Sequence, residues 1–202
     1  MVAAMMGEAA ESYTSYAAYL AMERDSNLRY QWLDGQVFAM AGGTIAHGLL
    51  GAAVIAELRG LASRCGCVVG SSDLKLRVRA TGLATYADGV VICGRAEVDP
   101  DDHNAVNNPS VLVEVLSDGT EGYDRGEKFE HYQRIEALRE YVLVSQRKRR
   151  IEVYTRAEGG SWTLTAAGAG ERVVIASLGG SLAVDRVYDG VELTATGQLR
   201  AL

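Results

Sequence analysis

Apolar residues in the first quarter of the chain recur first at helical and then at strand spacing. The helical pattern covers residues 12–29 and ends at Asp25-Ser26-Asn27. Residues 30–40 alternate around Asp34-Gly35, which is a strong signal for a two-residue hairpin turn. Thr44 is a plausible N-cap for a longer helix that reaches Arg64. The residues expected to face inward on this helix are Ile45, Leu49, Ala53, Val54, Leu58 and Leu61.

The middle of the chain is rich in strand-forming residues. Residues 68–78 and 84–93 are two such runs separated by a glycine-containing turn, so they predict an antiparallel pair. Residues 94–109 are polar and hold both prolines, which predicts a loop. Residues 110–117 are apolar at both alternating sets of positions, as expected of a central strand that is covered on both faces.

The second half continues with alternating helix and strand signals. Residues 125–138 predict a helix with Phe129, Tyr132, Ile135 and Leu138 facing inward. Residues 140–145 and 151–155 predict two further strands. Residues 157–202 are punctuated by glycine and predict a sheet extension with a tail. We therefore expect a single α/β domain over residues 1–202, with a mixed central β-sheet flanked by helices.

Composition supports a folded, globular chain. Apolar residues make up 48% of the 202 residues and charged residues 23%, which excludes disordered and fibrous classes. The apolar runs of the strands are too short to cross a bilayer, and no basic segment followed by an apolar one opens the chain. We therefore expect a soluble, cytoplasmic protein without a membrane partner. The three cysteines, Cys65, Cys67 and Cys93, lack a zinc-binding spacing and are expected to be reduced thiols.

The charge balance argues against a broad basic surface for nucleic acid. The formal net charge is -6 at pH 7, so any nucleic-acid interface must rest on local features. Lys75, Arg77 and Arg79 alternate along a predicted strand, and residues 147–150 form a short basic run. The simplest interpretation of both groups is solvated surface.

Three side chains suggest chemistry. Glu114 is a lone carboxylate in an apolar strand, which is costly unless it forms a salt bridge or binds a metal. Asp88 lies in the preceding apolar run, and two carboxylates on adjacent buried strands would suit Mg²⁺ or Mn²⁺. Lys128 lies along the inward stripe of its helix. It is either a flanking residue whose ammonium reaches solvent or a cation that orients water and stabilises phosphate charge.

A set of motifs across roughly residues 13–156 resembles one family. The motifs are Tyr30 with Asp34-Gly35, Met40-Ala41-Gly42-Gly43 with His47, Ser72-Asp73, Tyr86-Ala87-Asp88-Gly89-Val90-Val91, Val113-Glu114-Val115-Leu116-Ser117, and Tyr123-Asp124-Arg125-Gly126-Glu127-Lys128 followed by Tyr132 and Glu140-Tyr141. Together they resemble the Uma-two restriction endonucleases of the PD-(D/E)XK nuclease superfamily. The resemblance implies a restriction-endonuclease-like core over residues 13–156.

The resemblance also implies residue roles. Asp88 takes the place of the aspartate in the PD motif, and Glu114 takes the acidic position of (D/E)XK. Ala87 replaces the usual proline, Leu116 stands at the superfamily lysine, and Gln36 stands where relatives often have glutamate. Lys128 resembles the migrated lysine of this superfamily. If Gln36 replaces a third acidic ligand, metal affinity is expected to be lower.

The implied activity is hydrolysis of phosphodiester bonds by an endonuclease, with DNA as the expected substrate. Asp88, Glu114 and the Val115 carbonyl would hold one or two Mg²⁺ ions, with Mn²⁺ as an alternative, and Lys128 would position water. Bound metal would make the local electrostatic potential positive. The acidic net charge of the chain would then not prevent a phosphate from binding at the site. A homodimer is expected because cutting both strands with one site per chain favours two-fold pairing.

Four further polar residues are secondary candidates. His47 lies in the first turn of the long helix, where the helix dipole disfavours the charged ring, so a neutral hydrogen-bonding role is expected. Asp73 either approaches Asp88 or belongs to a polar cluster at a strand end. Glu57 is either an active-site acid or a partner of Arg64, and Asp124 is expected to cap the helix that carries Lys128.

Two alternatives to the nuclease remain open from the sequence. A nuclease fold that has lost catalysis and serves as a binding or assembly module is favoured by Gln36, Leu116 and the negative charge, and is opposed by Asp88, Glu114 and Lys128. A metal-dependent hydrolase of a small phosphorylated substrate is the other. Turnover of a small phosphodiester without oligonucleotide binding would favour that activity.

Overall fold

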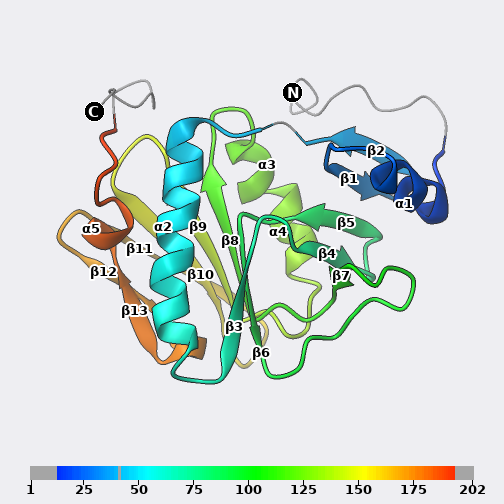
Figure 1. Ribbon diagram of the computed structural model, residues 1–202. Helices are drawn as coiled ribbons and strands as arrows, with labels where there is room; N and C mark the ends of the chain where they lie inside the picture. Colours follow the sequence, from blue (N-terminus) through cyan, green and yellow to red (C-terminus); the bar gives the residue numbers. More distant parts are fainter. Residues whose placement is uncertain (1–12, 41, 194–202) are drawn as a thin grey trace.

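The largest sheet of the computed structural model, which describes residues 13–40 and 42–193, has six strands in the order β11-β10-β9-β8-β6-β3 (Figure 1). β8 and β9 run parallel, while all other neighbours are antiparallel. The predicted α/β class with a mixed central sheet is therefore confirmed. The strands are β3 (Cys67–Ser71), β6 (Gly89–Cys93), β8 (Val111–Leu116), β9 (Glu140–Ser145), β10 (Arg150–Arg156) and β11 (Trp162–Gly168).

Two smaller sheets complete the strand framework. A five-stranded sheet has the order β2-β1-β5-β4-β7, and β12 pairs with β13 in a two-stranded sheet. The predicted hairpin at Asp34-Gly35 is confirmed, since both residues adopt positive φ angles of 44° and 90°. The strands are β1 (Tyr30–Leu33), β2 (Gln36–Ala39), β4 (Lys75–Val78), β5 (Leu83–Tyr86), β7 (Ala105–Val106), β12 (Arg172–Ile175) and β13 (Gly180–Ala183).

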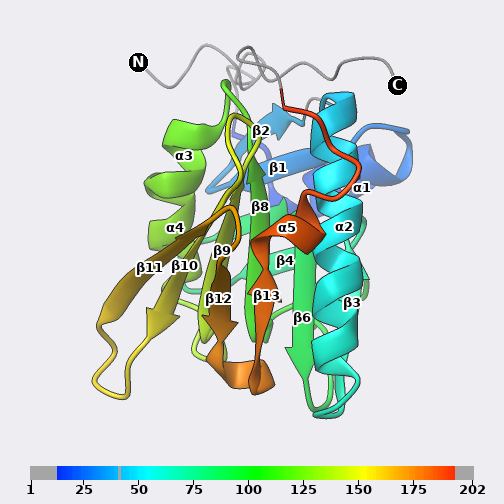
Figure 2. The ribbon, with the colours of Figure 1, turned by 90° about the vertical axis from the view of Figure 1, so that its left-hand side faces the viewer.

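The helices cover both faces of the six-stranded sheet. α2 lies against one face with β12, β13 and α5, while α3 and α4 lie against the other face (Figures 1 and 2). The elements are α1 (Tyr16–Arg24), α2 (Ile45–Ala62), α3 (Glu121–Arg125), α4 (Glu127–Tyr132), η1 (Ala176–Leu178) and α5 (Val184–Val187). Residue 12 of the predicted first helix and residues 194–202 of the predicted tail lie outside the described residues.

α2 confirms its predicted N-cap and part of its predicted inward face, since Val54 and Leu58 are buried. The hydroxyl of Thr44 accepts a hydrogen bond from the N–H of His47 at 3.1 Å. Ile45 and Leu49 were expected to be buried, yet they are 75% and 44% exposed. α2 is apolar on nearly every side, so periodicity alone did not select the face. The residues that are buried are Ala46, Leu50, Gly51, Val54, Leu58 and Ala62.

α2 is also long and apolar enough to resemble a membrane-spanning helix, which the sequence expectation did not consider. Over its 18 residues the mean hydropathy is 1.4, which by length and composition alone would suffice to cross a membrane. In the structure this helix contacts β3, β6, β8 and β13. Its apolar residues therefore contribute to the core on one face of the sheet.

Between β3 and β6 the chain changes sheets twice, and this places Asp88. The two β-rich runs do pair antiparallel, as predicted, but each run is divided into two strands. β3 pairs with β6 in the six-stranded sheet, whereas β4 pairs with β5 in the five-stranded sheet. The chain passes between the sheets at residues 72–74 and again at Ala87-Asp88. Asp88 therefore lies where the two sheets meet.

β8 is covered on both faces, as its sequence predicted. Every residue of β8 is buried. Val111, Val113 and Val115 pack on the α2 side, while Leu112 and Leu116 pack on the side of α4 and the five-stranded sheet. Because side chains alternate along a strand, Glu114 points to the second side. The carboxylate thus enters the layer that also contains α4.

The predicted helix over residues 125–138 is wrong in its extent. Gly126 has φ -110° and ψ -105°, which separates α3 from α4, and α4 ends at Tyr132. The following turns still bury Ile135 and Leu138, so the inward side chains were predicted correctly. The predicted loop over residues 94–109 contains one short strand, β7, which pairs with β4.

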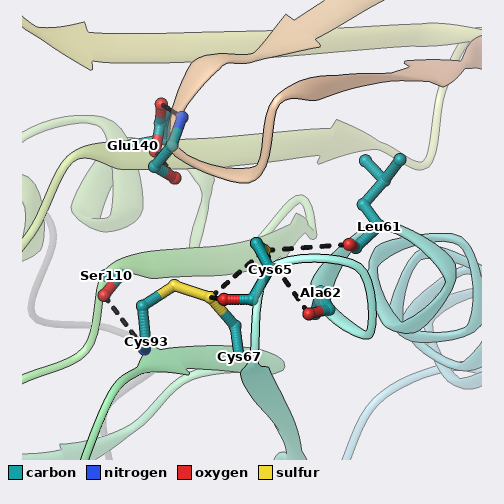
Figure 3. Close-up of a disulfide and its surroundings, with 8 residues drawn as sticks. Leu61, Ala62, Cys65, Cys67, Cys93, Ser110 and Glu140 are labelled. Atoms are coloured by element: carbon teal, nitrogen blue, oxygen red, sulfur yellow. Dashed lines mark hydrogen bonds between the residues drawn. A yellow bond between two sulfur atoms is a disulfide. The ribbon is translucent and has the colours of Figure 1, made fainter.

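The expectation of reduced thiols is wrong for two of the three cysteines. Cys67 and Cys93 form a disulfide between β3 and β6, with Cα atoms 4.2 Å apart (Figure 3). They are directly opposite in the antiparallel register, where side chains are close enough to bond. Cys65 is free, and its Sγ lies 3.3 Å from that of Cys67. Strand register, which the cysteine spacing does not reveal, determines this pairing.

Lys75 and Arg77 on β4 are not solvated surface, whereas Arg79, which follows β4, is half exposed. Arg77 lies over the rings of Tyr16 and Trp32 at 4.2 and 5.0 Å from their centroids. Lys75 forms ion pairs with Glu23 and Asp102, and Arg79 forms ion pairs with Asp99 and Asp101. These contacts tie β4 to α1 and to the loop before β7, so its cations are already neutralised or packed.

Candidate functional site

Asp88 extends the contact between β6 and β8 beyond their last paired residues. The strands pair as far as Gly89 and Val113. Oδ2 of Asp88 then accepts a hydrogen bond from the N–H of Val115 at 2.7 Å. The same oxygen lies 3.2 Å from Nε2 of His47 in the first turn of α2. Two elements thus fix one oxygen of this carboxylate.

One oxygen of Glu114 is likewise held in place, by side chains of α4. Its Oε1 lies 2.8 Å from Nζ of Lys128 and accepts a hydrogen bond from the hydroxyl of Tyr132 at 3.0 Å. Lys128 and Tyr132 are four residues apart on α4, so both face β8. The salt bridge considered from the sequence therefore exists, and its cation is Lys128.

Lys128 has no route to solvent. Its side chain is 6% exposed, so the interpretation as a residue that extends its ammonium into water is wrong. Besides Glu114, Nζ lies 3.5 Å from Oδ1 of Asp124 and donates to the carbonyl of Tyr86 at 3.3 Å. The ammonium group is thus surrounded by three oxygens of the protein.

The cluster combines three carboxyl groups with one buried ammonium. Among the described residues, Lys128 pairs with Glu114 and Asp124, while Asp88 pairs with His47. Burial raises the pKa of Glu114 to about 8; Lys128 opposes this shift, and the charges of Asp124 and Asp88 add to it. Burial alone would lower the pKa of Lys128, but Glu114 and Asp124 raise it above its ordinary value. Burial therefore favours the protonated form of Glu114 in the metal-free protein, and a bound cation would favour its ionised form.

His47 behaves differently from the expectation based on the helix dipole. Burial lowers the pKa of its ring, but the hydrogen bond to Asp88 and the charge of that carboxylate raise it overall. The carboxylate of Asp88 thus favours the charged ring, which is opposite to the direction expected from the helix dipole.

The other secondary candidates lie elsewhere or act differently. Asp73 is 76% exposed and pairs with Arg29, so it does not join Asp88. Glu57 pairs with Arg186 at 3.1 Å and not with Arg64. Gln36 is exposed at the start of β2. Leu116 is buried beside α4, where Lys128 supplies the cation.

Two members of the cluster were assigned other roles from the sequence. Asp124 was expected to cap a helix, but it lies inside α3, is 3% exposed and faces Lys128. Tyr132 was expected only to pack inward, yet its hydroxyl binds Glu114. Asp124 and Tyr132 stand four residues before and after Lys128. That spacing was the available signal.

The second oxygen of each central carboxylate has no hydrogen bond from the described residues. This holds for Oδ1 of Asp88 and for Oε2 of Glu114, whose other oxygens are both bonded. The cluster opens on the Asp88 side, since the side chains of His47 and Asp88 are 23% and 18% exposed, against 5% for Glu114. A ligand would therefore approach past His47.

A mixed sheet flanked by helices, with acidic side chains on adjacent central strands, defines a restriction-endonuclease-like α/β fold. The crystal structure of "a putative nuclease belonging to DUF820" from Anabaena variabilis shares this fold. The TM-score is 0.65 at 11% identity, covering 81% of this chain and 91% of that one.

Sequence comparisons show the family. Residues 16–185 match the model of the Uma2 family, described as "Putative restriction endonuclease". The chain therefore belongs to this nuclease-like family, as the motifs predicted. Two uncharacterized proteins of Synechocystis sp. are similar along most of their length. One is 34% identical over 86% of this chain and 90% of the relative, and the other is 29% identical over 80% and 91%.

Proposed function

We propose that this protein is a metal-dependent endonuclease that hydrolyses phosphodiester bonds of DNA, with Asp88 and Glu114 as the ligands of Mg²⁺. The observation that carries the proposal is the arrangement of the two carboxylates. Each is anchored through one oxygen, and the other oxygen has no hydrogen bond from the described residues. Anchored carboxylates with an open oxygen are suited to hold a hard cation.

The donor set fits magnesium better than a metal that needs a complete protein cage. In the described part of the chain, no three His, Cys, Asp or Glu side chains are grouped to hold a metal. Mg²⁺ commonly uses one or two carboxylates, several waters and the phosphates of its substrate. When bound, the ion would polarise the phosphate and lower the pKa of attacking water. Mn²⁺ favours similar oxygen ligands.

The protein's own residues would orient these groups. His47 holds Oδ2 of Asp88 from the open side, and Tyr132 holds Oε1 of Glu114 from the closed side. Lys128 balances the charge of Glu114 and Asp124. To position water as well, its ammonium would exchange one of its three protein acceptors for the water oxygen.

The proposal is tested by incubating supercoiled plasmid with the protein and Mg²⁺ or Mn²⁺. Asp88→Asn and Glu114→Gln should abolish nicking and linearisation, as should EDTA. Asp73→Asn and Glu57→Gln are matched controls, because they remove one carboxylate each outside the cluster. Cutting that survives in both site variants would show that the activity comes from elsewhere.

One observation favours a second candidate, a nuclease fold that binds or assembles without catalysis. Lys128 is already ion-paired with Glu114 and Asp124 and donates to the carbonyl of Tyr86, so its charge is balanced within the protein. If the folded protein cuts neither plasmid nor RNA with either metal, this function replaces the first.

A homodimer is part of the proposal, because cutting both strands of a duplex with one site per chain favours two-fold pairing. Size-exclusion chromatography with light scattering tests it. Twice the chain mass of 21.6 kDa is expected, and elution at a single chain mass would contradict it.

A further inference from the structure

The turn between β9 and β10 carries basic residues at the end of the sheet where β8 leads away from Glu114. Arg147, Lys148 and Arg149 are all exposed there. β9 pairs in parallel with β8, and the last pair is Leu116 with Ser145. The turn begins immediately after this pair. Figures 1 and 2 show the turn in yellow at the same end of the molecule as the first turn of α2.

Gln146 fixes the basic turn to the surroundings of the candidate site. Its Nε2 donates to the carbonyl of Leu116 at 2.9 Å, and its Oε1 accepts from the hydroxyl of Thr44 at 2.7 Å. Thr44 caps the helix turn that contains His47. The start of the turn is thereby held to both β8 and α2.

The cations of the turn have only weak partners. Arg147 pairs with Asp118 at 2.7 Å, and their side chains are 60% and 70% exposed. Arg149 lies 3.6 Å from Asp185, and both are about half exposed. No ion pair of Lys148 with another described residue is found. Exposed pairs of this kind contribute little to stability, so a competing anion can replace the aspartates.

We propose that Arg147, Lys148 and Arg149 bind backbone phosphates of the nucleic acid that enters the candidate site. In the free protein, Asp118 then occupies the position of a phosphate on Arg147. The guanidinium group recognises carboxylate and phosphate oxygens with the same paired donors. The inference rests on the proposed function, since it assumes a polynucleotide substrate.

Distance and charge both support this assignment. Leu116 lies two residues beyond Glu114, or about 7 Å along the strand. The carbonyl of Leu116 binds Gln146, which begins the basic turn, so the turn is fixed to the strand that carries Glu114. In the other basic group, Lys75 is buried, Arg77 is packed on aromatic rings, and Arg79 pairs with two aspartates, one of them fully buried. The β9–β10 turn instead presents three consecutive exposed cations.

The Arg147–Asp118 pair offers a test with two opposite outcomes. Binding of a labelled DNA duplex and of an RNA duplex of the same sequence is measured by fluorescence anisotropy in EDTA over a range of salt concentrations. Arg147→Ala should weaken binding and reduce the slope of log affinity against log salt by about 1. Asp118→Asn should strengthen binding, because it removes the competing carboxylate. The preferred duplex distinguishes DNA from RNA.

Arg134→Ala is the matched control. Arg134 is exposed and follows α4 at the opposite end of the sheet, near the start of β9, so its loss changes net charge equally but should alter binding less. If the ion pair only stabilises the fold, Arg147→Ala and Asp118→Asn should both weaken duplex binding. That result, or equal effects of Arg147→Ala and Arg134→Ala, overturns the inference.

The test is independent of catalysis because no metal is present. Wild-type cleavage of plasmid combined with unchanged binding in Arg147→Ala would overturn the phosphate contact and leave the nuclease proposal intact. If binding depends on Arg147 but neither metal supports cleavage, the phosphate contact stands and the nuclease proposal is overturned. Absence of binding to both duplexes at low salt would overturn the phosphate contact directly.

Discussion

Nζ of Lys128 lies 2.8 Å from Oε1 of Glu114, in a layer where both side chains are almost completely buried. Neither charge has enough contact with water to be stable alone. The two residues come from α4 and β8, so their ion pair also joins a helix to the central strand. Stability and chemistry in this cluster are therefore coupled.

Removing the lysine should destabilise the fold. Lys128→Met leaves the carboxylates of Glu114 and Asp124 without their shared cation, and breaking a buried pair from one side costs about 3–5 kcal/mol. Urea unfolding measures the change. The double variant Lys128→Met/Glu114→Gln should recover a large part of the loss, since it removes one uncompensated charge. Equal stability of the single and double variants would contradict the proposed coupling.

The stability of the metal-free protein should fall as pH rises. Burial raises the pKa of Glu114 to about 8 from an ordinary value of 4.5. A raised pKa in the folded state contributes stability that is complete below pH 4.5 and is lost as pH rises through 8. Unfolding in EDTA at several pH values measures this. Glu114→Gln should gain stability relative to wild type as pH increases, and a constant difference across this window would refute it.

His47 should support catalysis through Asp88 rather than supply the fold's stability. His47→Ala removes the partner at 3.2 Å from Oδ2 but leaves the N–H of Val115 in place. Loss of such a supporting group typically costs 10–100-fold in metal affinity or activity. Plasmid cleavage over a Mn²⁺ titration measures both. His103→Ala, at an exposed position outside the cluster, is the control, and matching effects of the two variants would argue against this role.

The central residues of the candidate site could be inferred from the sequence because each breaks an apolar strand pattern. Glu114 lies among buried valines and leucines, and Asp88 precedes the apolar run of β6. Burial makes a charged residue conspicuous at such positions. The position of Lys128 on the inward stripe of α4 followed from helical spacing.

The features that were not predicted depend on contacts between segments that are far apart in the sequence. Ile45 and Leu49 were assigned to the wrong face because α2 is apolar all round, and packing against the sheet decides the face. Asp124 was expected to cap a helix because the break at Gly126, which places Asp124 inside α3, is not evident from the sequence. The division of each β-rich run between two sheets likewise depends on tertiary pairing.

Reduction of the Cys67–Cys93 disulfide should lower stability without impairing the site. The two cysteines are 26 residues apart in sequence. Closing a loop of this length stabilises a fold by about 3–4 kcal/mol in the chain-entropy model. Cys93 also lies at the far end of β6 from Gly89, which follows Asp88 directly. Dithiothreitol should therefore reduce the free energy of unfolding, while plasmid cleavage at low temperature stays unchanged.

Two cysteine variants separate the disulfide from a general effect of the reductant. Cys93→Ser should reproduce the loss seen with dithiothreitol and should respond no further to it. Cys65→Ser removes the free thiol but keeps the bond, so its stability should match wild type under oxidising conditions. If Cys65→Ser is as unstable as Cys93→Ser, the thiol 3.3 Å from Cys67 contributes through exchange with the bond, and a single fixed disulfide is the wrong description.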